Sequence, residues 1–442
     1  MENYALKNKY FLFYTILFMM YCNLFVGWAF QNLKIFVLPI NEITLLLILS
    51  SLKIFQTLRN LKSIINILPF LIWIIYGLFL IVLGFFQHGI WALRDGVHVI
   101  DSLYFFAGFY LLSNEKYYTI FFKHIKYFII IAVIYIFFLP FKNIIQDILP
   151  QINAVAGSNV SGSLFNYSSL NTTWIWLAFY IIINRDEFDH GLIYSNVIPF
   201  LFFTTTVVVF TQRMIYLSIF ISFIFLFIFK RDSSKKFLIY IPVFIIMLSI
   251  LPLLNIEILN RVGGITSIDF IFDHVMSTFG TITSTSSLAT AGTIELRLLW
   301  FFQVIDNSFE SIATFFFGRG FGLPLIEYTG PNSTVYREPH NGYLTIYARM
   351  GLIGFLLWFW AHANFFKTWL KYYKFCKINN FNDKKNKLLG IIFFIIIVLS
   401  TAFANSAFEQ TWLSSIYYVI WGIILRMCYN IKLELSKKQV RN

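Results

Sequence analysis

Residues 64–86 read IINILPFLIWIIYGLFLIVLGFF, and no charged side chain interrupts them. A run of this length matches the roughly 20 apolar residues that an α-helix needs to cross the hydrocarbon core of a bilayer. Similar runs recur along the chain near 10–30, 36–54, 97–113, 124–141, 164–183, 192–210, 214–229, 237–254, 343–363, 388–404 and 412–429. The sequence therefore predicts an all-α polytopic membrane protein with about twelve transmembrane helices.

The composition of the 442 residues agrees with a lipid environment. Hydrophobic residues make up 58% of the chain and charged residues only 12%, whereas soluble domains carry about 25% charged residues. The formal net charge of +13 comes largely from Lys residues scattered between apolar runs, so it predicts no nucleic-acid partner. Orientation in the bilayer and contacts with membrane lipids explain this charge better, and a soluble enzyme is excluded.

The distribution of basic residues predicts how the chain is oriented. Lys and Arg in short loops mark the cytoplasmic side of a membrane. With the N-terminus inside, alternate connecting segments hold 25 of the 34 basic residues. Both termini are therefore expected in the cytoplasm. The predicted organisation is an N-terminal bundle of about six spans at 1–190, a second transmembrane domain at 191–430 and a cytoplasmic tail at 431–442.

The longest connecting segment, 255–342, is predicted to be one large extracytoplasmic loop. Its part 296–317 is apolar enough to resemble another span. A span there would place Asp306 and Glu310 near the middle of the membrane, at a cost of a few kcal/mol each. This part is therefore predicted to be an amphipathic helix at the membrane interface, and the Ser/Thr/Gly-rich part 277–293 is expected to be mobile.

The basic residues predicted to lie outside differ in kind from those inside. Seven of the nine outside are Arg, whereas 20 of the 25 inside are Lys. Arg grips phosphate in bidentate fashion, so an extracytoplasmic Arg cluster favours a ligand that bears a diphosphate. The alternative is that each Arg pairs with a nearby acid or reaches toward the membrane interface. The seven are Arg94, Arg213, Arg261, Arg297, Arg319, Arg337 and Arg349.

Two of these arginines have informative neighbours. Arg213 lies in TVVVFTQRMIYLSIF, between two apolar runs with almost no loop, so it is expected to face a wet cavity or a partner. Arg94 directly precedes Asp95 at the start of the span 97–113. A local ion pair between Arg94 and Asp95 is the simpler interpretation of that pair.

His340 and Asn341 follow Pro339 just before the span 343–363. The positive end of the helix dipole and neighbouring Arg residues disfavour an imidazolium there, so His340 is expected to be neutral and able to act as a general base. The alternative is a surface histidine without a role. Outside the membrane there is no DxD motif or paired His/carboxylate cluster, so a metal-dependent transferase is not expected. The missing P-loop excludes an ATP-driven pump.

Several motifs in a fixed order resemble the O-antigen ligase/polymerase superfamily. They are TQR at 211–213, ELRLLW at 295–300, GRGFG at 318–322, and PHNGYL followed by RMGLIG within 339–354. The resemblance covers roughly 195–430, whereas the N-terminal half agrees only in span number and in Arg94. It implies a bacterial glycosyltransferase that passes many times through the inner membrane, acts at the periplasmic face and uses no metal or other cofactor.

The resemblance also implies roles for individual residues. The donor would be a glycan on undecaprenyl diphosphate, transferred with inversion to a hydroxyl of the acceptor. His340 would be the catalytic base, and Arg213 and Arg297 would bind the diphosphate and stabilise it as leaving group. Secondary contacts with the substrate, or the orientation of His340, are expected from Arg94, Arg337, Glu338 and Asn341.

Three activities stay open at the level of sequence. A polymerase joins lipid-linked repeat units of an O-antigen, capsule or exopolysaccharide, and a possible partner is a protein that regulates chain length. A ligase moves the finished glycan to the lipid A core. The polymerase is preferred because polymerases for many different glycans outnumber ligases. A flippase of lipid-linked oligosaccharide is the alternative from another class, but transporters usually show repeat symmetry.

Overall fold

The computed structural model describes residues 2–35, 38–149, 151–153, 161–163, 170–188, 191, 193–210, 213–250, 269–270, 273, 285–326, 328–329 and 335–441. These residues form a bundle of helices with small antiparallel ribbons at its loops. The ribbons pair β1 (Lys34–Ile35) with β2 (Leu38–Pro39), β3 (Gln151–Asn153) with β4 (Ser161–Ser163), and β5 (Tyr328–Thr329) with β6 (Val335–Tyr336). The all-α prediction is confirmed.

Each of the twelve predicted apolar runs lies at least partly on helix. The first half of the chain forms α1 (Glu2–Tyr21), η1 (Cys22–Val26), α2 (Trp28–Asn32), α3 (Ile40–Ser51), α4 (Ile54–Lys62), α5 (Leu68–His88), α6 (Ile90–Asp95), α7 (Val97–Asp101), α8 (Tyr104–Leu111), α9 (Glu115–Phe138), η2 (Leu139–Phe141), α10 (Lys142–Ile148), α11 (Leu170–Ile183) and η4 (Arg185–Phe188). The second half forms η5 (Ile193–Val197), α12 (Ile198–Phe210), α13 (Arg213–Phe229), α14 (Arg231–Ile250), α16 (Thr285–Ser308), α17 (Ile312–Phe317), α18 (Gly342–Ile378), α19 (Asn382–Thr401) and α20 (Thr411–Arg441).

Several described helices are long and apolar enough to cross a membrane. By length and composition these are Leu68–His88, Glu115–Phe141, Gly342–Ile378 and Thr411–Ser436. The pair α3 and α4, bent by 79°, adds a fifth if it forms one span. Shorter apolar helices such as Leu170–Ile183 accompany them. The chain is therefore an all-α multi-pass membrane protein, and the number of twelve spans stays a prediction.

Helix α5 shows how the sequence separates a lipid face from a protein face. Bulky apolar side chains recur every three or four residues on its exposed side, at Leu68, Ile72, Ile75, Phe79, Val82 and Phe86. The opposite side is buried at Phe70, Trp73, Gly77, Ile81 and Gly84. Lipid tails are as apolar as these side chains, so close packing selects the buried face. A Cβ at Gly84 would lie only 2.3 Å from the Phe321 carbonyl oxygen, so glycine lets the GRGFG segment approach.

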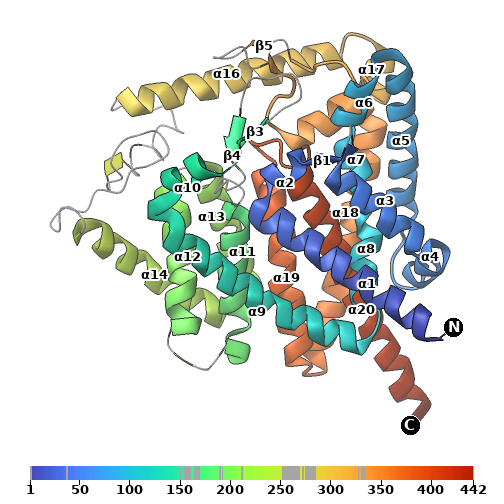
Figure 1. Ribbon diagram of the computed structural model, residues 1–442, viewed down its shortest axis with the longest axis vertical. Helices are drawn as coiled ribbons and strands as arrows, with labels where there is room; N and C mark the ends of the chain where they lie inside the picture. Colours follow the sequence, from blue (N-terminus) through green and yellow to red (C-terminus); the bar gives the residue numbers. More distant parts are fainter. Residues whose placement is uncertain are drawn as a thin grey trace.

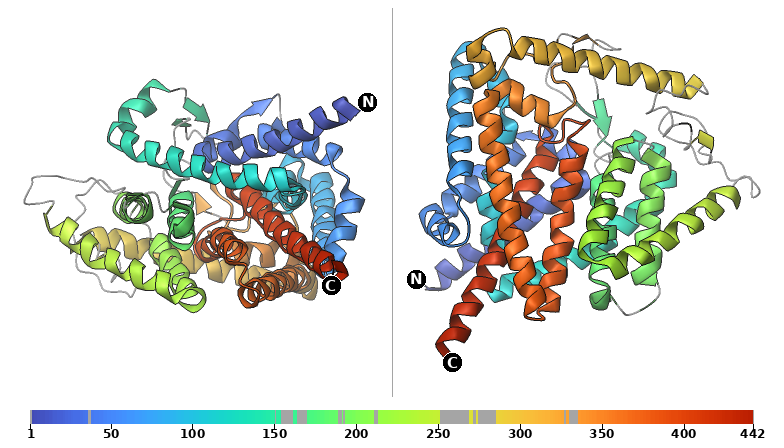
Figure 2. Two further views of the ribbon diagram at one scale, coloured as in Figure 1. Left: turned by 90° about the horizontal axis from the view of Figure 1, so that it is seen from below. Right: turned by 180° about the vertical axis from the view of Figure 1, so that it is seen from behind.

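The helices run mostly along one direction, and α16 crosses one end of the bundle. Figure 1 shows α16 lying over the ends of the other helices, with α17 beside the end of α5, while both termini lie toward the opposite end. The two further views agree on this crossing (Figure 2). The halves of the chain are packed together, because α20 contacts α8, α11 contacts α19, and α18 contacts α5.

The large connecting segment differs in detail from its prediction. The expected single helix at 296–317 is divided, because α16 ends at Ser308 and Ser311 caps the start of α17. The expected mobile part 277–293 is only partly described, and its residues 285–293 belong to α16. Because α16 crosses the bundle end instead of running along the other helices, it does not form an additional span in this arrangement.

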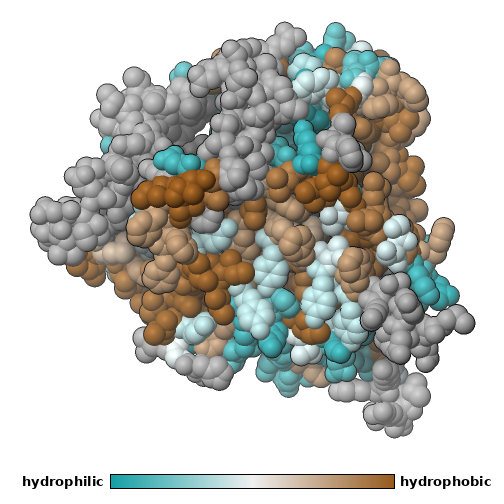
Figure 3. Space-filling model, viewed as in Figure 1, coloured by the Kyte–Doolittle hydropathy of each residue, from teal (hydrophilic) through white to brown (hydrophobic). Residues whose placement is uncertain are grey.

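The molecular surface reflects this arrangement. On the face drawn in Figure 3, apolar side chains cover much of the middle and the flank formed by α5, whereas hydrophilic side chains gather toward the lower edge. Exposed apolar side chains on this scale mark a surface that contacts lipid or another protein. The surface agrees with a membrane protein.

Candidate active site

The motif RMGLIG interrupts α18. Gly351 has φ 65° and ψ −172°, which is not helical, and a Cβ there would lie 2.3 Å from a neighbouring backbone oxygen. A break leaves carbonyl groups without partners inside the helix. The carbonyls of Ala348 and Arg349 accept hydrogen bonds from the backbone N–H groups of Arg319 (2.8 Å) and Gly320 (3.0 Å). The interruption therefore docks the GRGFG motif against RMGLIG.

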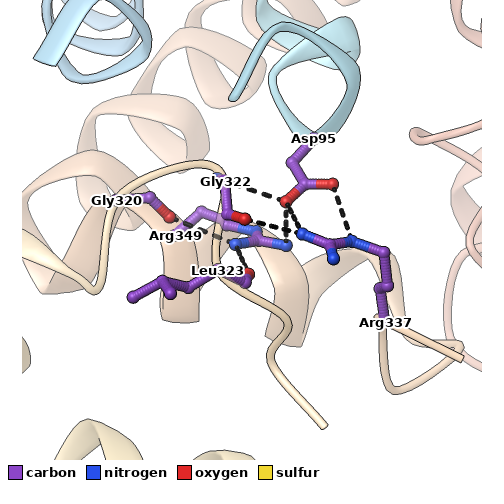
Figure 4. A network of polar contacts seen from close by, with 6 residues as sticks. All are labelled: Asp95, Gly320, Gly322, Leu323, Arg337 and Arg349. Atoms are coloured by element: carbon purple, nitrogen blue, oxygen red, sulfur yellow. Dashed lines mark hydrogen bonds and ion pairs between the residues drawn. The ribbon is translucent and has the colours of Figure 1, made fainter. Parts of the chain in front are cut away.

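The docking of these two motifs brings Arg337 and Arg349 into contact with the carboxylate of Asp95 (Figure 4). Asp95 ends α6, and its side chain is inaccessible to solvent. The carboxylate forms ion pairs with Arg349 Nη2 at 2.9 Å and with Arg337 Nη2 at 3.0 Å. It also accepts a hydrogen bond from the backbone N–H of Gly322 at 3.2 Å. Residues more than 200 positions apart thus meet at one carboxylate.

The two arginines of this Asp95 cluster (Asp95, Arg337 and Arg349) have further partners. Arg349 donates to the Gly320 carbonyl at 3.3 Å and to the Leu323 carbonyl, and its side chain has no solvent exposure. Arg337 donates to a backbone carbonyl at 2.7 Å, and its guanidinium lies 4.3 Å from the ring centre of Trp91. Removing one member of such a buried network leaves an uncompensated charge. The cluster therefore holds three segments of the chain together.

The prediction of a local ion pair between Arg94 and Asp95 is wrong. In the described part of the chain, the ion pairs of Asp95 are with Arg337 and Arg349. The guanidinium of Arg94 instead lies 5.0 Å from the ring centre of Trp91. Arg94 and Arg337 thus share one indole ring as a cation–π partner.

His340 lies in the turn that leads into α18. Its φ of 51° is positive, a conformation that non-glycine residues seldom adopt and that occurs more often at functional sites. Its ring centre lies 5.6 Å from that of Trp300 on α16. Burial lowers the pKa of His340, the charge of Arg297 lowers it further, and Glu338 acts in the opposite direction. The expected neutral state of His340 agrees with this direction, and burial, which the sequence argument did not include, is its largest cause.

Asn341 caps α18 and ties it to the next connection. Its side-chain oxygen accepts a hydrogen bond from the Leu344 N–H at 3.0 Å, and its amide nitrogen donates to the Phe403 carbonyl at 2.9 Å. The neighbouring N–H of Gly342 donates to the Ala402 carbonyl at 2.9 Å. These bonds position the His340 turn, so Asn341 acts on the site through the backbone.

Arg297 lies on α16 and bonds the connection between α19 and α20, to which the His340 turn is also bonded. Its Nη1 donates to the Ala404 carbonyl at 3.2 Å, and its charge acts on His340. The motif ELRLLW thus supplies both Arg297 and Trp300 to the surroundings of His340. The crossing helix places these side chains over the start of α18.

Arg213 is the first residue of α13, and its predicted role depends on a side chain outside the described part of the structure. Residues 211 and 212 of the TQR motif also lie outside the described residues. Five positions further on, the Ser218 hydroxyl lies 3.1 Å from the Thr401 hydroxyl at the end of α19. The start of α13 is therefore at the same end of the bundle as Asn341 and its partner Phe403.

Two residues at this end of the bundle, Arg349 and Glu409, were not assigned a catalytic or substrate-binding role from the sequence. Arg349 was recognised as one of the outside arginines, but its pairing with Asp95 depends on the break at Gly351. Glu409 lies in the short connection between α19 and α20, and both of its carboxyl oxygens are buried. A single acid in a short loop has no distinctive spacing, so the sequence offered no signal for Glu409.

Comparison with known proteins identifies part of the chain. Residues 198–359 match the family described as O-antigen ligase. No curated protein matches the chain. The matched residues run from α12 to the first half of α18, and they include Arg297, the GRGFG segment and the His340 turn. The match over residues 198–359 supports the resemblance of this part of the chain to the O-antigen ligase/polymerase superfamily.

Proposed function

We propose that the protein is a repeat-unit polymerase for an O-antigen, capsule or exopolysaccharide. It transfers a glycan from undecaprenyl diphosphate to a hydroxyl of another lipid-linked repeat unit, with inversion and without a metal. The observation that carries this proposal is the meeting of three features at the start of α18. They are a histidine of lowered pKa, an arginine beside it and an apolar groove that begins at the next residue.

The histidine suits the acceptor half of the reaction. A base must be unprotonated to take the proton of a hydroxyl, and both burial and Arg297 favour the neutral imidazole of His340. The acceptor oxygen forms its bond to the anomeric carbon while the proton passes to His340. The bond from that carbon to the diphosphate oxygen breaks, and its electron pair leaves with the diphosphate.

The arginines suit the leaving group. Arg297 is proposed to contact the departing diphosphate, and Arg213 is proposed to assist from the start of α13. A fixed guanidinium stabilises charge that develops on the leaving oxygens, which is the task that a metal ion performs in other transferases. Arg94, which shares the Trp91 ring with Arg337, is proposed as a secondary contact. Arg337 is proposed to act mainly by holding Asp95 and the GRGFG segment.

The groove suits a lipid-linked donor. It has a volume of about 530 Å³ and runs from Asn341 along α18. Its α18 side chains recur at helical spacing, so they form one stripe. They are Phe355, Trp358, Phe359, His362, Ala363 and Phe366, and Leu399 and Phe403 face them. An isoprenoid chain in this groove would leave its diphosphate near Arg297 and His340.

The orientation follows from the same assignment. We place the α16 end of the bundle in the periplasm and both termini in the cytoplasm, with twelve spans in a bacterial inner membrane. This orientation is supported by the Lys-rich segments, which lie mainly on the predicted inner side. A protein that regulates chain length is a further proposed partner.

The test is gel analysis of surface glycan from a deletion strain that carries either the wild-type gene or His340→Ala. A core bearing a single repeat unit in the variant strain supports the polymerase. Long chains on the lipid carrier together with a bare core would indicate a ligase. Single lipid-linked units trapped in the cytoplasmic leaflet would indicate a flippase and contradict an enzyme.

A further inference from the structure

Helix α4 turns sharply away from the apolar helix that precedes it. The axes of α3 and α4 are bent by 79° at the break between them. A short helix that turns by such an angle from an apolar helix lies along a membrane surface and not across the membrane. In Figure 1, α4 lies at the lower end of α5, away from α17. The exposed apolar side of α5 begins at this end with Leu68, so α4 lies where the lipid-facing surface starts.

The outer side of α4 combines one aromatic ring with two positive charges. Phe55 is 90% exposed, and Arg59 and Lys62 are exposed as well. These residues are four and three positions apart, so they form one stripe, the α4 stripe. The other side of α4 is fixed to the protein core through Leu61. An exposed ring beside basic side chains is typical of a helix at the lipid headgroups.

Helix α18 carries a second exposed stripe with a similar composition. Lys367, Lys371 and Lys374 are exposed and follow one another at helical spacing. Trp360, which is 52% exposed, precedes Lys367 by about two turns. We call these four residues the α18 basic stripe. An indole ring followed by lysines is typical of the passage from acyl chains to headgroups.

Hydrogen bonds bring the two stripes to one place. The side-chain amide of Asn364, one turn before Lys367, donates to the carbonyl of Asn66 at 3.2 Å, in the connection between α4 and α5. The ammonium of Lys432 on α20 donates to the Ser63 carbonyl at 2.6 Å, directly after α4. The end of α4 is therefore held against α18 and α20, beside the start of the lysines of α18.

The positive charge of the two stripes is not neutralised by described acids. Neither α4 nor α18 contains Asp or Glu. In the part of the chain that the structure describes, the basic residues of both stripes form no ion pair. Helix α19, which begins directly after α18, differs in this respect, because its Lys387 pairs with Glu187 at 3.0 Å and with Asp383 at 2.8 Å. The charge of the stripes is thus available to an anion from outside the protein.

We propose that the α4 stripe and the α18 basic stripe together bind an anionic phospholipid of the leaflet at this end of the bundle. Arg59, Lys62 and Lys367 contact the phosphate, while the acyl chains lie beside Phe55 and Trp360. Charge complementarity selects a headgroup with a net negative charge over a zwitterionic one. The site lies toward the far end of α18 from His340, and it does not depend on the proposed glycan transfer.

The test measures lipid binding by the purified full-length protein in detergent. The protein is titrated with phosphatidylglycerol or with phosphatidylcholine of identical acyl chains, and native mass spectrometry counts the bound lipid. Wild type should bind phosphatidylglycerol more tightly. Arg59→Gln/Lys367→Gln should weaken that binding about 30-fold, because each basic residue near an anionic surface contributes about fivefold, and should leave phosphatidylcholine binding unchanged. Equal affinity of wild type for the two lipids would overturn the proposal.

A matched control separates a local site from the effect of net charge. Lys116→Gln/Lys123→Gln removes two exposed lysines of α9 and should bind phosphatidylglycerol like wild type. Equal losses in the two double variants would mean that net charge alone acts, and the site would be rejected. Arg59→Lys/Lys367→Arg keeps both charges and should retain binding; a loss there would contradict recognition by charge. A protein that transfers no glycan would contradict the proposed function and leave this test unaffected.

Discussion

The Asp95 cluster and the surroundings of His340 lie at the same end of the molecule but use arginine differently. In the Asp95 cluster, Arg337 and Arg349 converge on one carboxylate and on carbonyl groups of the GRGFG segment. Near His340, Arg297 donates to the Ala404 carbonyl at 3.2 Å, and its charge lowers the pKa of the neighbouring histidine. The first arrangement joins distant segments of the chain, and the second lowers the pKa of a histidine.

The largest effect is expected from His340→Ala. Loss of the base should lower the transfer rate by about 10²- to 10⁴-fold while thermal unfolding in detergent stays unchanged. A matched control is His124→Ala, because His124 lies on α9 and bonds the Tyr21 hydroxyl at 2.8 Å, away from the site. A His340→Ala protein with the wild-type rate would remove His340 from the chemistry.

Asp95→Asn should chiefly affect stability. It leaves the buried guanidinium of Arg349 without its ionic partner, which typically costs about 3–5 kcal/mol of unfolding free energy. The double variant Asp95→Asn/Arg349→Gln should recover part of this loss, because the charge is removed as well. Thermal unfolding in detergent measures the stability of the single and the double variant. A loss of unfolding free energy below about 1 kcal/mol for Asp95→Asn would show that the Asp95 cluster contributes little to stability.

Substitution of Arg297 should change both the rate of glycan transfer and the pH dependence of that rate. Arg297→Lys keeps the charge but cannot form two parallel hydrogen bonds as a guanidinium does. The transfer rate should therefore fall by about tenfold, which corresponds to the loss of one hydrogen bond to a charged group. Arg297→Gln removes the charge that lowers the pKa of His340. Activity should then be lost at a higher pH on the acid side, and an unshifted profile would contradict the electrostatic contact.

The smallest effect is expected from Asn341→Ala. The loss of a helix cap costs about 1 kcal/mol, and the tie to Phe403 is lost with it. Asn341→Asp retains the capping oxygen and loses only the donor to Phe403. A smaller loss of unfolding free energy for Asp than for Ala would show that capping is the main contribution of Asn341.

The motifs single out several residues that the structure brings close to His340. The grouping of Arg297 and Glu338 around His340, and the neutral imidazole, agree in direction with the structure. The pairing of Asp95 could not be predicted, because the adjacent Arg94 is the obvious partner in sequence, whereas the two arginines that bind Asp95 come from distant segments.

The helical character of this chain and its membrane environment could be predicted without knowledge of its fold. Length, apolar character and the spacing of charges are local properties, and the lipid acts on each run separately, so each run predicts its own helix. Which charged groups meet depends instead on tertiary packing. The break at Gly351, the docking of GRGFG and the crossing of α16 bring distant side chains together, and those contacts depend on packing between helices that no local pattern contains.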